Sequence, residues 1–153
     1  MDKEFKISRL EKCDVDQAIE LAVSCFGEKT REEVVYETKT SFSDNYYKPF
    51  IYVAKCNSEV IGLIMGHEMG FYPNIQSLSW LCVKEDHREY NLGRKLIKHA
   101  EEDTVKNIWK NKSGTFIGVS VIGKKYHKEL GYEYHGNTHD EYPFIIKKYI
   151  ADK

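Results

Sequence analysis

The apolar run from Ser77 to Val83 constrains the fold of this chain more than any other feature. The run is mostly continuous and does not alternate, which predicts a central strand that is buried on both faces. A long amphipathic pattern follows and ends near Gly114, and its apolar stripe consists of Leu92, Leu96, Ile97, Ala100, Ile108 and Trp109. A second strand pattern comes next, at 115–121. A strand, a helix and a strand in this order need a crossover connection, which predicts a sheet covered by helices.

The rest of the chain predicts two more long helices and several strands. Asp14 and Thr30 each precede a helical pattern, and each is followed three residues later by Gln or Glu, which predicts two capped helices. The first helix has an apolar stripe and ends at Gly27, whereas the second is polar. The remaining strand patterns lie at 4–10, 50–56, 60–69, 132–135 and 144–150, and a short helix ends at Gly131. The predicted fold class is α/β: a mixed, mostly antiparallel sheet of about seven strands, with helices on both faces.

Length and charge narrow the class of protein. The chain has 153 residues, enough for one sizeable core, so we expect residues 1–153 to form a single domain. Its 23 basic and 24 acidic side chains nearly balance, which argues against a nucleic-acid partner because phosphate binding needs a basic excess or stripe. No apolar run is long enough to span a membrane. The four cysteines form no Cys-x-x-Cys pair, and we expect reduced thiols in a cytoplasmic protein.

The segment from Val83 to Arg94 joins the predicted central strand to the longest helix. The first amides of a helix lack partners within the helix, so such a junction can bind an anion. Gly93 allows a ligand to approach the backbone, and Asn91 tolerates a left-handed conformation. Arg88 and Arg94 can both contact phosphate oxygens. These residues predict a phosphorylated cofactor. Alternatively, Gly93 only relieves crowding between helix and sheet, and the two arginines face solvent.

Three parts of the sequence match a known pattern. Residues 88–93 read Arg-Glu-Tyr-Asn-Leu-Gly, residues 81–83 read Leu-Cys-Val, and residues 126–132 read Tyr-His-Lys-Glu-Leu-Gly-Tyr. The first resembles the signature of the GCN5-related N-acetyltransferases (GNAT superfamily): Gln or Arg, two residues, Gly, one residue, then Gly or Ala. The second is similar to that family's apolar fourth strand, and the third to its Phe-Tyr-x-Lys-x-Gly-Phe segment. The predicted element order also agrees along nearly all of the chain.

This resemblance implies a binding site for acetyl-CoA as the co-substrate. The implied contacts come from the central strand, the loop after it and the following strand: Leu81, Cys82, Val83, Arg88, Asn91, Leu92, Gly93, Arg94 and Ser120. The backbone amide of Val83 would stabilise the tetrahedral intermediate of acyl transfer. Asn91 replaces one of the family's two glycines, and Ser120 replaces a frequent asparagine.

His127 is the implied catalytic acid, and it departs from the family pattern. The family often has a tyrosine at this position, which protonates the departing thiolate of coenzyme A; here the tyrosine, Tyr126, comes one residue earlier. An imidazolium could supply the same proton. Alternatively, His127 only fills a packing position in the short helix.

The acceptor amine has no motif of its own. In a fold of this family, the loop after 132–135 would border the acceptor groove opposite the polar second helix, which suggests Tyr36, Tyr134 and His135 as substrate contacts. Aromatic and acidic groups suit a cationic amine, and Glu68 is a further substrate-binding candidate. His67 and Glu68 are also candidates for the general base, although a solvated strand end explains both.

Two features concern metals and oligomers. His135, His139 and Asp140 have a spacing that a helix could turn into a metal site, but they lie in a predicted loop, so we expect no metal. The predicted edge strand at 144–150 could pair between two chains in a homodimer. Lys147 and Lys148 in that strand could equally prevent such pairing.

Together these features predict an N-acetyltransferase that transfers the acetyl group of acetyl-CoA to a primary amine by direct attack. Catalysis would then depend mostly on positioning. The alternative is a non-catalytic module of the same fold that binds or senses acyl-CoA. A third possibility is a structural domain that has lost the coenzyme site.

Overall fold

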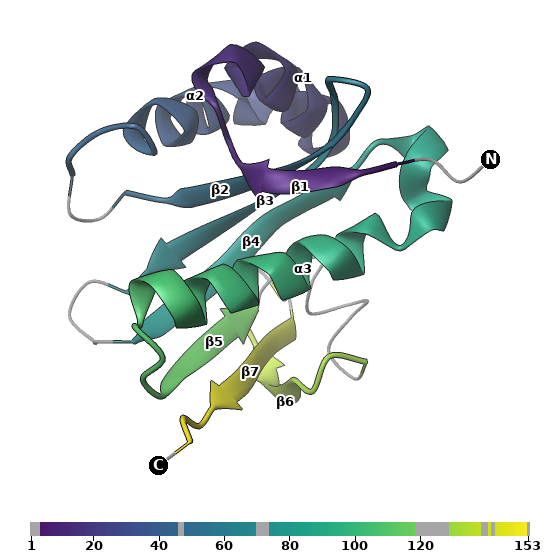
Figure 1. The fold of residues 1–153 in the computed structure, drawn as a ribbon. Coiled ribbons are helices and arrows are strands. Elements are labelled where there is room, and N and C mark those ends of the chain that lie inside the picture. The colour runs from purple at the N-terminus through teal and green to yellow at the C-terminus, as the bar shows by residue number, and fades with distance from the viewer. Residues whose placement is uncertain are drawn as a thin grey trace.

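Seven strands form one mixed sheet in the computed structural model, which describes residues 4–45, 48–69, 74–118, 129–138, 141 and 143–152 (Figure 1). The strands lie in the order β1-β2-β3-β4-β5-β7-β6. Their bounds are Lys6–Arg9 (β1), Phe50–Cys56 (β2), Glu59–Glu68 (β3), Ile75–Val83 (β4), Gly114–Gly118 (β5), Glu133–Asn137 (β6) and Pro143–Tyr149 (β7). β4 and β5 pair in parallel, and the other neighbours pair antiparallel. The predicted mixed, mostly antiparallel sheet is therefore confirmed.

Helices cover both faces of this sheet. α1 (Val15–Phe26) and α2 (Arg31–Thr40) lie on one face, and α3 (Leu92–Asp103) lies on the other (Figure 1). Successive side chains of β3 enter two separate cores: Leu63 and Met65 pack in the cluster beneath α1, and Ile64 packs in the cluster beneath α3. We call these two sides the α1 face and the α3 face. Within the described residues, no helix is both long and apolar enough to cross a membrane.

The helices begin and end differently from the predicted pattern. Short 3-10 segments precede all three, at Lys12–Asp14, Glu28–Thr30 and Glu85–Tyr90. The predicted helix that ends near Gly114 consists of α3 and a π-helical turn at Thr104–Ile108. The π-helical turn keeps Trp109 in the core on the α3 face, where it packs against Phe116 of β5.

The two predicted helix caps are wrong. Asp14 makes no cap hydrogen bond, because its Oδ2 accepts one from Lys55 Nζ at 2.9 Å. The side chain of Gln17 bonds the backbone of β3. Thr30 Oγ1 donates to the carbonyl of Gly27 at 2.7 Å and also leaves its helix uncapped. Tertiary contacts and the preceding 3-10 turns therefore hold these helix starts.

β4 separates from β5 about halfway along its length. The parallel pairing runs from Ile75 opposite Thr115 to Leu78 opposite Gly118, whereas β4 continues to Val83. The register against β3 shifts at the same place, and Trp80 has a φ of +55°, which is rare for a bulky residue and marks a bulge. Beyond Leu78, β4 remains paired with β3 on one edge, and no described strand pairs with its other edge.

Candidate functional site

The loop between β4 and α3 has the geometry of an anion site. Asn91 adopts the left-handed conformation, with φ +57° and ψ +28°, and α3 begins directly after it. Asparagine tolerates this conformation better than most residues, as the sequence predicts. Within the described residues, no side chain caps α3, and its first turn contains no acidic residue. The amides of this turn are thus available to a negatively charged ligand.

Buried side chains hold this loop in place. The His87 side chain is buried, and its Nδ1 lies 2.7 Å from Asp86 Oδ1. Its ring packs against those of Phe5 and Tyr90. On the helical side, Leu92 is fully buried in the core beneath α3. The loop is therefore fixed at both ends, which lowers the entropy that a ligand would lose on binding.

Arg88 lies at the centre of the loop. Its Nε donates a hydrogen bond of 3.0 Å to the carbonyl of Val83, which directs the guanidinium along the end of β4. The same side chain borders a cavity of about 480 Å³, whose other lining residues are Ser24, Cys25, Lys84, Glu85 and Asp86. The predicted Arg88 and Val83 are thus brought together, and the guanidinium also interacts with the Cys25 thiol on the cavity wall, where it could meet a phosphate.

Arg94 and Gly93 occupy the first turn of α3. Gly93 is buried. The guanidinium of Arg94 forms an ion pair with Glu129, which is 35 residues further along the chain. Its Nε is buried and has no hydrogen-bond partner among the described residues. Arg94 is thus beside the loop, but its charge is already paired with that of Glu129.

Leu81, Cys82 and Val83 form the end of β4 that is paired with β3 on one edge and with no described strand on the other. Cys82 lies opposite Leu63 and Val83 opposite Gly62 of β3. The side chains alternate, because Leu81 and Val83 enter the core on the α3 face and Cys82 enters the core on the α1 face. At the edge turned away from β3, where no described strand pairs beyond Leu78, an extended ligand could add to the strand by main-chain hydrogen bonds.

The predicted acceptor residues lie on different parts of the sheet. Tyr36 is exposed on α2, over the α1 face. Tyr134 is also exposed but is paired with Ile145, which belongs to the core on the α3 face. His135, its neighbour, lies 3.7 Å from Glu133. Glu68 is the last residue of β3, and strand alternation places its side chain on the α3 face. The structure thus does not gather these four side chains on one face, and their role in binding stays a prediction.

His67 is better placed than Glu68 for proton transfer on the α1 face. Its Nε2 lies 3.1 Å from Glu37 Oε2 of α2, and both side chains are half-buried. In the neutral tautomer whose Nε2 donates to this carboxylate, Nδ1 carries the lone pair. Glu37 has no counterpart in the sequence analysis, because the pair joins α2 to β3 and no short motif contains both.

Cys25 is a second feature that the sequence analysis missed. It ends α1 beside the loop, is half-buried, and lines the 480 Å³ cavity. The pKa of its thiol is lowered to about 6, chiefly because a hydrogen bond from the Cys82 thiol stabilises the thiolate. Arg88 lowers it further by its charge. The helical spacing of Ala18, Ala22 and Cys25 was a usable signal, since it places the thiol on the stripe that faces the sheet.

Some predicted residues lie outside the described part of the chain. These are Ser120 and His127, together with Tyr126, His139 and Asp140. Within the described residues, no group of three or more His, Cys, Asp and Glu side chains is arranged to hold a metal ion.

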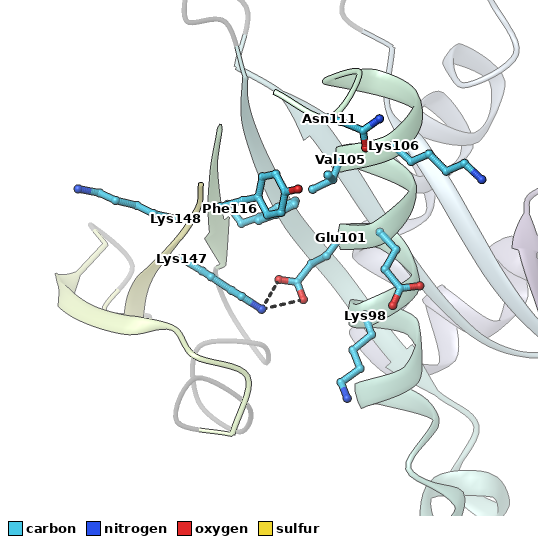
Figure 2. Close-up of a pocket in the computed structure, with 10 residues that line it drawn as sticks. Lys98, Glu101, Val105, Lys106, Asn111, Phe116, Lys147 and Lys148 are labelled. Atoms are coloured by element: carbon cyan, nitrogen blue, oxygen red, sulfur yellow. Dashed lines mark hydrogen bonds and ion pairs between the residues drawn. The ribbon is translucent and has the colours of Figure 1, made fainter. Parts of the chain in front are cut away.

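A second hollow lies between α3 and β7, away from the loop (Figure 2). It has a volume of about 580 Å³ and is lined by Lys98, Glu101, Glu102, Val105, Lys106, Asn111, Phe116, Lys147, Lys148 and Tyr149. Lys147 Nζ contacts both carboxylate oxygens of Glu101, at 3.2 and 2.9 Å, and Tyr132 also donates to this carboxylate. The buried carboxylate of Glu101 is thus paired within the fold.

A family model matches most of this chain. The model described as "Acetyltransferase (GNAT) family" matches residues 15–132, from the first residue of α1, through the β4–α3 loop, to the residue before β6. Among curated proteins, sequence comparison finds no significant relative.

Solved structures show the same fold at low sequence identity. PaiA N-acetyltransferase from Thermoplasma acidophilum, in complex with coenzyme A, has 19% identity and a TM-score of 0.73, covering 95% of this chain and 99% of that one. The GNAT family N-acetyltransferase YhbS from Escherichia coli, in complex with CoA, has 14% identity and a TM-score of 0.76, with coverages of 97% and 83%. An aminoglycoside 6'-N-acetyltransferase complexed with coenzyme A has 16% identity and a TM-score of 0.72, with coverages of 97% and 99%.

Proposed function

Because this chain belongs to the GNAT acetyltransferase family, we propose that it transfers the acetyl group of acetyl-CoA to a primary amine by direct attack. The observation that carries this proposal is the end of β4. There the strand leaves β5 after Leu78, and Asn91, which is left-handed and directly follows the 3-10 turn at Glu85–Tyr90, leads into the uncapped start of α3. Three of the similar structures are CoA complexes, which supports the same ligand here.

The residues present fit the parts of this ligand. The amides of residues 91–94 and the guanidinium of Arg88 would bind the pyrophosphate, since both offer donors to phosphate oxygens. The free edge of β4 at Leu81–Val83 would bond the amide groups of the pantetheine arm, as an added strand does. Gly93, which carries no side chain, would let the phosphates approach the helix start.

The reaction itself needs few side chains. The amine nitrogen would attack the thioester carbonyl, the carbon–sulfur bond would break, and the thiolate would leave with a proton. The Val83 amide would donate a hydrogen bond to the oxygen as it gains negative charge. His127 stays the predicted proton donor to the thiolate.

We assign the removal of the amine's proton to His67. The imidazole stands on the α1 face beside Ser77, whose hydroxyl donates to the His67 carbonyl at 3.3 Å. Nε2 lies 3.1 Å from Glu37, and in the neutral ring that donates to this carboxylate Nδ1 would take the proton through a chain of waters, because His67 lies five residues along β3 from Gly62, the partner of Val83. Glu37 acts through His67 and is therefore a positioning residue.

Calorimetric titration with acetyl-CoA tests the ligand, with pantetheine, which lacks the phosphates, as the control. We expect R88A to bind acetyl-CoA about 10- to 100-fold more weakly, because a hydrogen bond to a charged group contributes about 1.5–3 kcal/mol. R31A is the matched control, since Arg31 pairs with Glu20 and Glu28 on exposed helix surface. Equal affinity for pantetheine and acetyl-CoA would contradict the phosphate site.

Acetyl transfer to a panel of primary amines then tests the reaction. Binding without transfer to any amine would favour the alternative of an acyl-CoA-binding module. For the base, we expect H67A to lower kcat while acetyl-CoA affinity stays unchanged. E37Q should lower kcat less than H67A and leave acetyl-CoA affinity unchanged, because the ring remains but loses the carboxylate that orients it. A kcat of E37Q equal to that of the native protein would remove Glu37 from the mechanism.

A further inference from the structure

The hollow between α3 and β7 lies apart from the β4–α3 loop and has no part in the proposed reaction (Figure 2). Its volume of about 580 Å³ is in the range of small-molecule sites. The loop residue Arg88 borders a different cavity, and the two cavities share no lining residue. The hollow is therefore a second candidate site, and its walls indicate which class of ligand it suits.

The walls of the hollow nearest the core are apolar. Phe116 of β5 is 1% exposed and belongs to the core on the α3 face, and Val105 of the π-helical turn packs against that core. Tyr149 of β7 is also partly buried there. In Figure 2 the side chains of Phe116 and Val105 point toward each other across the hollow. The apolar body of a ligand could lie over these side chains and lose its contact with water.

The rim of the hollow carries more positive than negative charge. Four lysines line it, against two glutamates. One lysine, Lys147, is paired with Glu101. The other three, Lys98, Lys106 and Lys148, are exposed and form no ion pair with another described residue. Lys106 and Lys148 point away from the hollow in Figure 2, so they contribute to its potential at a distance. The rim therefore favours an anion over a cation.

Lys147 can contact an anion without leaving Glu101. Its ammonium group has three donors, and the two Glu101 oxygens, at 2.9 and 3.2 Å, use at most two of them. Tyr132 donates to the same carboxylate, which therefore stays satisfied. Lys98 precedes Glu101 by three residues on α3, so the two side chains are neighbours on one side of the helix. An anionic group beside this carboxylate would meet the ammonium groups of Lys98 and Lys147.

We propose that the hollow between α3 and β7 is a binding site for an organic anion with an apolar body, such as an aromatic carboxylate or sulfonate. The apolar body would pack over Phe116 and Val105, and the anionic group would contact Lys98 and Lys147. This inference does not rest on acetyl transfer, because the hollow contains no residue of the loop that would bind acetyl-CoA.

Fluorescence titration of the full chain with anilinonaphthalene sulfonate tests this site. The control probe is phenylnaphthylamine, which has the same aromatic body without the sulfonate. We expect the sulfonate to bind about tenfold more tightly than the uncharged probe, because two partly exposed ammonium groups contact it. Added salt should weaken only the sulfonate. Equal affinities for the two probes would show that charge has no role and would overturn the proposal.

Coenzyme A and R88A separate this site from the proposed active site. Saturating coenzyme A should leave the sulfonate titration unchanged, and R88A should bind the sulfonate as the native protein does. This holds even if acetyl transfer is never observed, so the two proposals can fail separately. Displacement of the sulfonate by coenzyme A, or its loss in R88A, would place the anion at the β4–α3 loop and overturn the proposal.

Two variants test the walls of the hollow. K98E reverses an exposed charge at the rim and should weaken the sulfonate about 5- to 10-fold. K39E is the matched control, because Lys39 is exposed on α2, over the opposite face of the sheet. V105W should fill part of the hollow and weaken both probes, with circular dichroism to check that this half-buried position tolerates the change. Equal sulfonate affinities of K98E and K39E would overturn the proposal, whether or not V105W folds.

Discussion

The two ends of α3 differ in whether their polar groups have hydrogen-bond partners within the fold. At the start of the helix, Asn91 is left-handed, no described side chain caps the first turn, and Arg88 contributes one hydrogen bond to Val83. At the end of the helix, Asp103 accepts hydrogen bonds from Tyr52, from Arg9 at 2.9 Å and from Asn107 at 2.7 Å. The start therefore offers unused donors, whereas the end has satisfied its charge within the fold.

Glu101 extends the same contrast. This carboxylate is buried at 7% exposure and is held by Tyr132 and Lys147, so that it ties α3 to β7 (Figure 2). Polar groups that are satisfied inside a fold add to stability, and their removal leaves partners unpaired. Polar groups left open at a rigid helix start cost little in the free protein and are available to a ligand. Substitutions at the two ends should therefore change different measured quantities.

The largest effect is expected from D103A. It leaves the buried hydroxyl of Tyr52 and the guanidinium of Arg9 without their acceptor, and hydrogen bonds to a charged group contribute about 1.5–3 kcal/mol each. We expect the free energy of unfolding to fall by about 2–3 kcal/mol in urea denaturation, with acetyl-CoA affinity unchanged. A loss of affinity equal to that of R88A would show that the two ends are not separate.

The pH dependence of D103N checks the charge at the same site. Burial alone would raise the pKa of Asp103, but the hydrogen bonds from Tyr52, Asn107 and Arg9 outweigh it and lower the pKa. A lowered pKa in the folded state stabilises the protein above the unfolded value of about 3.9, and this contribution is lost as pH falls through the folded value. The stability difference between native protein and D103N should therefore narrow in acid.

The next largest effect is expected from N91V, at the other end of the helix. A β-branched residue in the left-handed conformation costs about 1–2 kcal/mol, so in the free N91V protein the loop should leave that conformation and must regain it on binding. We expect acetyl-CoA affinity to fall about 5- to 30-fold by calorimetry. N91G is the matched control and should bind at least as well as the native protein, because glycine adopts this conformation freely. Equal affinities for N91V and N91G would mean that the conformation of residue 91 does not shape the site.

This contrast also explains how far the sequence could predict the molecule. The start of α3 was predictable, because the strand, the loop and the helix are contiguous and Asn91 has a clear conformational preference. The end was not, because Asp103 meets Arg9 and Tyr52 only after the chain has folded. The Cys25–Cys82 and His67–Glu37 pairs could not be predicted for the same reason, because their members are far apart in the sequence. It also made the cap predictions fail, since Asp14 found Lys55, a distant partner that sequence spacing does not reveal.

A smaller effect is expected from E101Q, and its sign depends on pH. Burial raises the pKa of Glu101, although Lys147 and Tyr132 partly oppose this. A raised pKa in the folded state means that the contribution of Glu101 to stability is fully present below the unfolded value of about 4.3 and is lost as pH rises through the folded value. E101Q, which does not titrate, should gain stability relative to the native protein over that range.

The smallest effect is expected from E129Q. This variant tests whether Arg94 contributes to ligand binding, as Arg88 does, or only to the fold, as Asp103 does. Arg94 lies in the first turn of α3, yet its guanidinium is paired with Glu129, and both side chains are about half exposed. Exposed ion pairs contribute about 0–1 kcal/mol, so the free energy of unfolding should change by less than about 1 kcal/mol. If the released guanidinium turns to the phosphates, acetyl-CoA affinity should rise up to about fivefold, the equivalent of that same free energy. If affinity stays constant, Arg94 serves the fold as Asp103 does, and Arg88 is the arginine on which the phosphate site depends.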